Sequence, residues 1–212
     1  MSRTPPVMPT IPVAQSPASP GRAFVQNAPM AMNNNGDQQA INYLINNQIQ
    51  LAHIMREIGI KLAAPNVAYP GFSIYFIVTA KKLEKKATKL MLLIQLLGGS
   101  YTLNPINPQN TGFENPAAAL EAIVGFQDAM VNNLKLAAVN DPALKELISH
   151  VVKKKALWLG FNRGMLTRLN RVRNDPAGLQ RLDDELLVIE LYKKYHNKLY
   201  NKDNGNNNNH KH

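Results

Sequence analysis

Residues 100–116 read SYTLNPINPQNTGFENP, and this stretch decides the fold of the chain. Its prolines oppose helix and strand, because proline fixes φ and lacks an amide hydrogen. At about 17 residues, the stretch is long for a connection between neighbouring helices. A connection of this length can cross from one end of a helical domain to the other. We therefore expect the helices before and after it to lie parallel.

Two helices are predicted before this crossover. Residues 37–64 place apolar side chains at helical spacing, and Asp37 is a plausible cap. Residues 71–97 form the second helix, which Gly98-Gly99 would end. The apolar positions of the first helix are Ile41, Leu44, Ile45, Ile49, Ile54, Ile58 and Leu62.

Three more helices are predicted after the crossover, over residues 117–139, 142–173 and 177–200. The last two follow Asn-Asp-Pro, which supplies a cap and a proline for the first helical turn. No segment has a credible strand pattern. The predicted fold class is all-α: a four-helix bundle with a long crossover between helices 2 and 3 and a fifth C-terminal helix.

Three regions follow from this pattern. Residues 1–36 hold seven of the fourteen prolines and no acid, and we expect a disordered arm. Residues 37–200 form the bundle, and the asparagine-rich residues 201–212 form a disordered tail. We expect a cytoplasmic protein. A mitochondrial location is the alternative, since Arg3 and Arg22 are unopposed by acids, although the prolines oppose an amphipathic targeting helix.

The chain is basic, with a formal net charge of +10. This favours acidic partners, although a solvated basic surface is the simpler interpretation. Nucleic acid is not expected, because no binding motif is present and Trp158 with Phe161 resembles core packing. No cysteine is present, which excludes disulfides and thiolate chemistry. No apolar run approaches the roughly 20 residues of a membrane helix.

Lysines concentrate in residues 81–91, KKLEKKATKLM. On a helix, Lys82, Lys86 and Lys89 share one stripe. Such like charges persist when they face solvent or an acidic protein partner, and both interpretations stay open. A second basic segment comprises Arg163, Arg168, Arg171 and Arg173.

Several local segments follow one another at characteristic spacing. They are Ile45-Asn46-Asn47-Gln48-Ile49-Gln50-Leu51; Phe72, Tyr75 and Phe76; Lys89-Leu90-Met91 before Gly98-Gly99; Glu121; Asn140-Asp141-Pro142; and Pro176-Ala177-Gly178-Leu179. In this order the segments resemble ferritins. The resemblance covers about residues 38–187, although the third helix is several residues short and the fifth is long.

The resemblance implies where an iron-oxidising centre would lie. The glutamate of the first helix falls on Ala52, and the glutamate and histidine of the second fall on Leu83 and Lys86. The bridging glutamate of the third falls on Gln127, and the glutamine of the fourth falls near Ala156. Carboxylates and imidazoles would be needed to hold iron there. We therefore predict no catalytic, cofactor or metal site residues and no enzyme activity; iron enters only through the resemblance.

Lys86 has two interpretations. It could donate to Gln127 inside the bundle, or extend its stem and keep its charge near water, which we favour.

Weaker metal signals remain elsewhere. His53/Glu57 and Glu146/His150 are paired at one-turn spacing, but two ligands rarely make a site. The ferritin channel acids would include Asp141 and Glu146, but Ser149 replaces the next one. In ferritin subunits without an iron-oxidising centre, acids on the inner cage surface nucleate the mineral. The resemblance places this region in the second helix, where the chain has the apolar and basic residues Ile74, Ile77, Val78, Lys81 and Lys82. His210 and His212 lie in the predicted tail and are taken as non-functional.

Two functions stay nearly level on the residues alone. The first is a ferritin-family subunit without ferroxidase activity, at most a structural part of an iron-storage shell in intracellular iron homeostasis. It would form homo-oligomers or assemble with active ferritin subunits. The second is a repurposed ferritin fold, a basic structural or protein-interaction module that binds no iron.

Overall fold

The computed structural model describes residues 36–96, 98, 100–106 and 115–206, with side chains described as far as Lys193. These residues form five helices and no strand, so the predicted fold class is confirmed. The helices are α1 (Gly36–Leu62), α2 (Pro70–Leu96), α3 (Pro116–Leu136), α4 (Pro142–Arg171) and α5 (Pro176–Asn206). Their ends lie close to the predicted ones, except at the end of α5.

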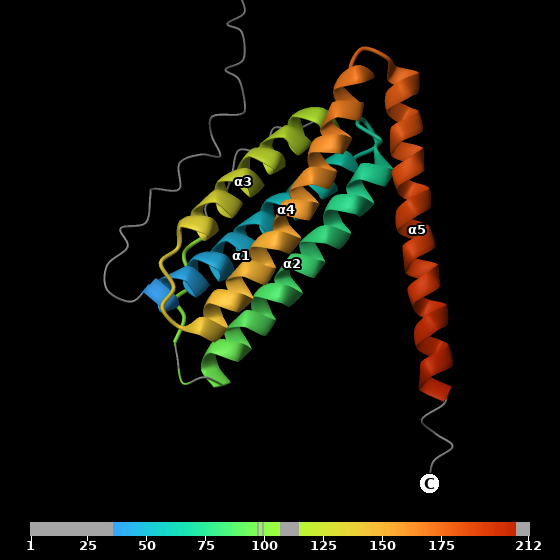
Figure 1. Cartoon of the computed structure of the whole chain (residues 1–212). Coiled ribbons are helices and arrows are strands. Elements are labelled where there is room, and N and C mark those ends of the chain that lie inside the picture. The colour runs from blue at the N-terminus through green and yellow to red at the C-terminus, as the bar shows by residue number, and fades with distance from the viewer. Residues whose placement is uncertain (1–35, 97, 99, 107–114, 207–212) are drawn as a thin grey trace, which may run out of the picture.

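The first four helices form one bundle, and α5 lies outside it (Figure 1). α2 and α3 run in the same direction, as the long crossover predicted. The close pairings are α1 with α2, α3 with α4, and α1 with α3, while α5 packs against α2. Most of the bundle core comes from aliphatic and aromatic side chains of α1, α2 and α3 that are almost fully buried, including Ile54, Phe72, Phe76 and Ile123.

Side-chain caps define the starts of two bundle helices. The Asn115 side chain accepts a hydrogen bond from Ala117 N at 2.8 Å at the start of α3. Asp141 accepts from Leu144 N at 2.8 Å at the start of α4, as predicted. Asp37 differs from its prediction: it lies inside α1 and accepts from Asn140 N at 2.6 Å. It therefore ties the start of α1 to the α3–α4 connection.

Asp183 joins α5 to the bundle. Its fully buried carboxylate accepts hydrogen bonds from Gly71 N at 3.0 Å and Phe72 N at 2.8 Å. These amides belong to the first turn of α2, where backbone N–H groups have no acceptor within their own helix. Gly71 permits the contact, because a Cβ there would lie 1.9 Å from the Asp183 carbonyl oxygen. One carboxylate thus caps α2 and fixes the position of α5.

The predicted disordered tail begins too early. Residues 201–206 continue α5, because extending an existing helix adds a backbone hydrogen bond for each residue fixed and no proline interrupts the segment. Residues 1–35 of the predicted arm and 207–212, with His210 and His212, lie outside the described residues. None of the helices in the described ranges combines the length and apolarity of a membrane span.

We expect Asp183→Ala to detach α5 from the bundle. The substitution leaves two buried amides without acceptors, which costs about 1–3 kcal/mol for each such group. Hydrogen exchange should show faster exchange in α5 and the first turn of α2, and urea unfolding should show lower stability. Asp184→Ala is the control, because Asp184 is exposed and accepts a hydrogen bond from Gln180 of its own helix. Equal effects from the two variants would refute this role of Asp183.

Candidate functional site

Three of the positions implied by the ferritin resemblance face the bundle interior. Ala52, Leu83 and Gln127 are 0%, 2% and 1% exposed. Ala52 and Leu83 belong to the main apolar cluster. Lys86 is exposed instead, in agreement with the favoured interpretation that its charge stays near water. Two of the three inward positions are therefore apolar, and the third is an amide.

The position that the resemblance places near Ala156 in α4 lies beside a buried lysine. Ala156 is exposed, whereas its neighbour Lys155 is buried at 5% exposure. The rotation of α4 explains the difference, because Lys155 shares the inward stripe with Ile148, Leu159 and Asn162. Among the described residues, the buried lysine of this bundle is thus Lys155, which the sequence analysis did not single out.

A chain of neutral polar side chains crosses the bundle beside Lys155. Tyr75 donates its hydroxyl to Asn162 Oδ1 at 2.6 Å, and Trp158 Nε1 donates to the Tyr75 oxygen at 3.2 Å. Asn162 Nδ2 donates in turn to Gln127 Oε1 at 2.9 Å. Burial raises the pKa of Tyr75 to about 12, so it stays neutral. The chain pairs buried polar groups from three helices without a charged member, and it leaves Gln127 Nε2 without an acceptor in the described structure.

The Lys155 ammonium has no comparable partner. Its Nζ is buried, and no atom in the described part of the chain accepts a hydrogen bond from it. It lies 5.4 Å from the centroid of the Trp158 ring, within reach of a cation–π attraction. Burial, and then the charge of Lys86, lower the pKa of Lys155 to about 7. The site therefore holds a cation that is easily neutralised and lacks a counter-ion.

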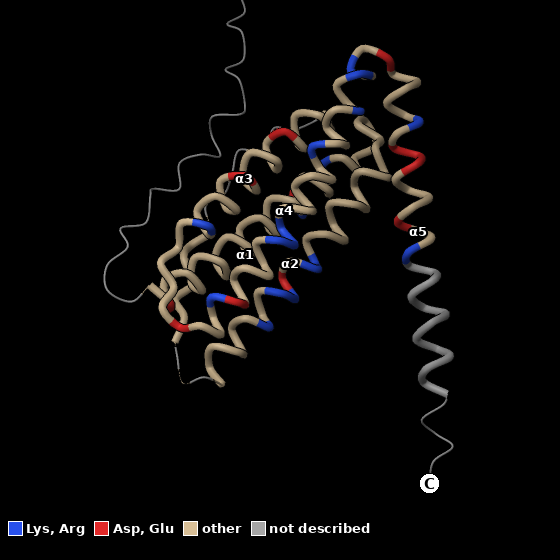
Figure 2. Tube along the Cα trace, viewed as in Figure 1, with Lys and Arg blue, Asp and Glu red and all other residues tan. Residues whose placement is uncertain are grey.

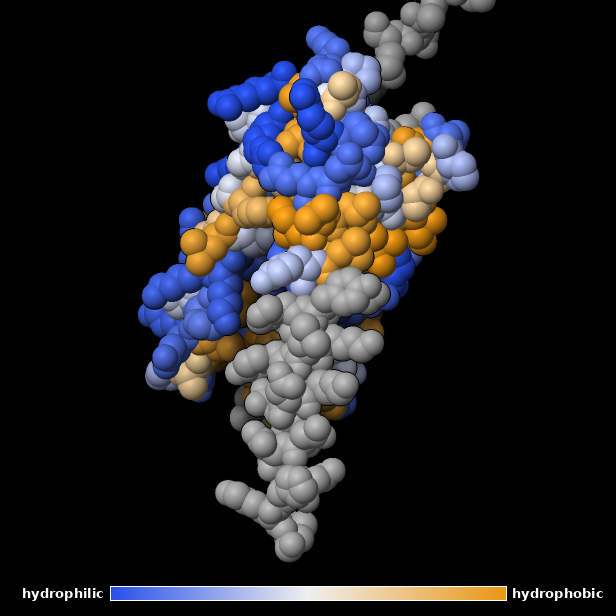
Figure 3. All heavy atoms as spheres, turned by 90° about the vertical axis from the view of Figure 1, so that its right-hand side faces the viewer, coloured by the Kyte–Doolittle hydropathy of each residue, from blue (hydrophilic) through white to orange (hydrophobic). Residues whose placement is uncertain are grey.

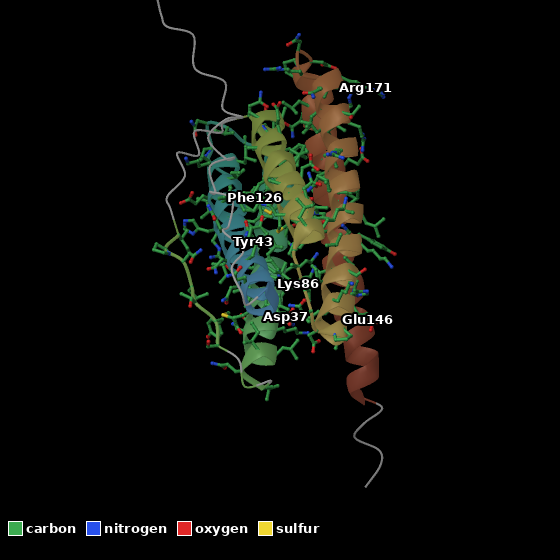
Figure 4. All side chains as sticks on the ribbon, turned by 60° about the vertical axis from the view of Figure 1, so that its left-hand side comes forward. Asp37, Tyr43, Lys86, Phe126, Glu146 and Arg171 are labelled. Carbon is green, nitrogen blue, oxygen red and sulfur yellow. The ribbon has the colours of Figure 1, made fainter. Side chains whose placement is uncertain are left out.

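Further lysines line the seam between α2 and α4. Partial burial, followed by the charges of Lys154 and Lys82, lowers the pKa of Lys86. Figure 2 shows the basic residues in blue on neighbouring stretches of these two helices, and Figure 4 labels Lys86. Over the described residues, α2 and α4 are not among the closely packed helix pairs. Like charges and a wide spacing thus coincide at this seam.

The lysine stripe of α2 differs from the arginine segment of α4. As predicted, Lys81, Lys82, Lys85 and Lys89 are all exposed. Two of the arginines instead have acidic partners: Arg163 pairs with Asp128 at 2.9 Å and Arg168 with Glu185 at 2.5 Å. Within the described residues, these α2 lysines therefore form no ion pair, whereas two of the arginines do.

The other predicted residues give no metal site. His53 Nε2 lies 3.1 Å from Glu57 Oε1 on the surface of α1. Glu146 and His150 form no ion pair within the described ranges, where no cluster of three potential metal ligands occurs. Phe161 was expected in the core with Trp158, but it is 51% exposed and packs against the Tyr75 ring at 6.2 Å.

The sequence did contain a signal for Lys155 and Asn162. Both fall on the stripe that continues Ile148 through Leu159 to Leu169 at intervals of three, four and seven residues. Assigning the face of α4 from that stripe, rather than from the family pattern, would have placed both inside. The partners of Asn162 come from α2 and α3, and no local pattern indicates them.

Searches for a matching protein-family model and for a matching curated protein found none. Among the solved structures that are similar in fold, two are described as a novel open pore ferritin from the hyperthermophilic archaeon Archaeoglobus fulgidus. Each has a TM-score of 0.67 and 18% identity, over 74% of this chain and 98% of the other. At this identity the similarity establishes a ferritin-like fold for the chain.

Lys155→Met should stabilise the protein near neutral pH. The pKa of Lys155 is lower in the folded protein than in the unfolded chain, so the unfolded chain binds more protons between pH 7 and 10. The free energy of unfolding of the wild-type protein therefore increases with pH because of Lys155, by at most roughly 4 kcal/mol over this range. The variant lacks this contribution, so its advantage over wild type should shrink toward pH 10.

Urea unfolding at several pH values measures this difference. Lys153→Met is the control, since Lys153 is exposed on the same helix and the substitution removes the same charge. A stability difference between Lys155→Met and wild type that does not change with pH would contradict the buried, partly neutral lysine.

Proposed function

We propose that this chain is a ferritin-type subunit that does not oxidise iron(II). At most it contributes a structural subunit to an iron-storage shell in intracellular iron homeostasis, as a homo-oligomer or together with active ferritin subunits. The observation that carries the proposal is the set of inward positions: Ala52, Leu83 and Gln127 replace acids, and Lys155 adds a cation.

The chemistry of these side chains opposes an iron centre. Iron ions in helical bundles are held by carboxylate and imidazole ligands from several helices. Alanine and leucine offer no donor atom, and the Gln127 oxygen already accepts a hydrogen bond from Asn162. An ammonium repels a cation and has no lone pair to share while protonated. The residues present therefore do not fit the implied iron centre.

The outer surface supports a role in assembly. Several large apolar side chains are well exposed on different helices, among them Leu96 at 85%, Leu136 at 76% and Leu157 at 77%. Association of subunits would remove such surface from water. These exposed side chains support a subunit that assembles into a shell rather than a protein that remains monomeric.

The second candidate is a basic interaction module. Two observations favour it: the α2 lysines form no ion pair among the described residues, and Val188, Ile189 and Leu191 expose an apolar strip on α5 (Figure 3). An acidic protein partner would complement the lysines. Assembly behaviour separates the two functions, because a shell component must form large oligomers and an interaction module need not.

Purified protein should oxidise iron(II) in air no faster than a solution without protein. The physical reason is the absence of carboxylate and imidazole ligands at the four positions that the resemblance implies. Absorbance of iron(III) over time measures the rate, with an active ferritin subunit at equal concentration as the positive control. Oxygen-dependent oxidation clearly above the blank would refute the non-oxidising subunit.

The shell role predicts large assemblies in solution. Sedimentation velocity and light scattering should find oligomers of the chain alone, or mixed oligomers after refolding with an active ferritin subunit. The exposed apolar side chains supply the driving force. Monomers under both conditions would exclude a shell component and favour the interaction module.

A further inference from the structure

A pocket of about 410 Å³ lies in the seam between α2 and α4, with part of its wall from α1. Its size falls in the range of small-molecule sites, about 300–1,000 Å³. Two buried polar side chains line it, Gln48 at 2% and Lys155 at 5% exposure, together with Trp158. We call this cavity the seam pocket; it shares Trp158 with the chain of hydrogen bonds that ends at Gln127, whereas Tyr75, Asn162 and Gln127 do not line it.

Both buried polar groups lack hydrogen-bond partners in the described structure. Lys155 Nζ donates to no acceptor, and Gln48 Oε1 accepts from no donor. A half-turn of the Gln48 amide about its last torsion exchanges its oxygen and its NH₂ group, so it can also donate into the pocket. An unsatisfied buried ammonium is costly, and an anion placed against it would remove much of that cost.

The walls of the seam pocket have two different characters. Leu90 and Leu93 from α2 face Leu147 and Val151 from α4 along its apolar side. The remaining lining residues are basic: Lys86, Lys89, His150 and Lys154. Among the described residues that line the pocket, none is acidic. A ligand that fits both walls carries a negative head group and an apolar tail.

We propose that the seam pocket binds a single-chain amphiphilic anion, with a carboxylate or phosphate head group against Lys155 and Gln48 and an alkyl tail along Leu90, Leu93 and Val151. The surrounding lysines attract the anion and hold it at the mouth. This binding activity goes beyond the structural role proposed above, and neither depends on the other.

Trp158 provides a direct readout, because it is the only tryptophan of the chain and lines the pocket. We would titrate the full-length protein with decanoate and with decyl phosphate, below their micellar concentrations, and record tryptophan fluorescence. Both should give a saturable change. Decanol tests the head group, and acetate and inorganic phosphate test the tail. Each should bind more weakly than the corresponding amphiphilic anion.

Two variants locate the head group. Lys155→Met should weaken decanoate binding about 10- to 100-fold, the loss expected for one hydrogen bond to a charged group, and leave decanol binding nearly unchanged. Lys153→Met removes the same charge from an exposed residue that does not line the pocket, and it should bind decanoate like wild type. Circular dichroism confirms that both variants fold.

Four outcomes would overturn the proposal. They are no saturable fluorescence change with either anion, equal binding of decanol and decanoate, equal losses in the two lysine variants, and equal binding of decanoate and acetate. Binding to anionic phospholipid vesicles without any response to the soluble anions would likewise refute the pocket and assign the lysines to a membrane surface. Iron oxidation and oligomer size are measured separately, so failure here leaves the proposed function standing.

Discussion

The buried ammonium of Lys155 is the constraint around which this bundle is organised. A protonated amine without a counter-ion is strongly disfavoured inside a protein, and the residues that line the seam with Lys155, Lys86 and Lys154 among them, include no acid. Burial, and then the charge of Lys86, accordingly lower the pKa of Lys155 to about 7. The seam between α2 and α4 holds a pocket lined by this side chain.

The neutral hydrogen-bond chain beside it shows why the rest of the interior tolerates polar groups. Tyr75, Trp158, Asn162 and Gln127 satisfy most of one another's donors and acceptors across three helices. Such a network fixes the relative register of its helices, because each bond has a narrow range of lengths and angles. The relative register of α2, α3 and α4 therefore depends on amide, hydroxyl and indole groups.

How far the sequence predicts this molecule depends on whether the deciding contact is local. Proline, asparagine and apolar spacing gave the helices and the parallel arrangement across residues 100–116, since each signal acts within a few residues. The prediction that Asp37 caps its own helix was wrong, because the backbone amide of Asn140 that it binds lies about a hundred residues away. Asp183 was missed for the same reason, because the amides it binds belong to α2. The buried face of α4 that carries Lys155 was missed although the apolar stripe of α4 itself indicates that face.

A lysine ammonium and a bound metal ion are two different ways of placing positive charge inside a helical bundle. A metal ion gathers carboxylates from several helices and can leave, whereas a lysine is permanent and requires no acids around it. Ala52, Leu83 and Gln127 are compatible with Lys155 in the same interior, because none of the three carries a charge that a bound metal ion would have to balance. Protonated Lys155 is a donor that suits an anion and repels a cation. The uncharged inward side chains at these positions and the basic lining of the seam pocket therefore act in the same direction.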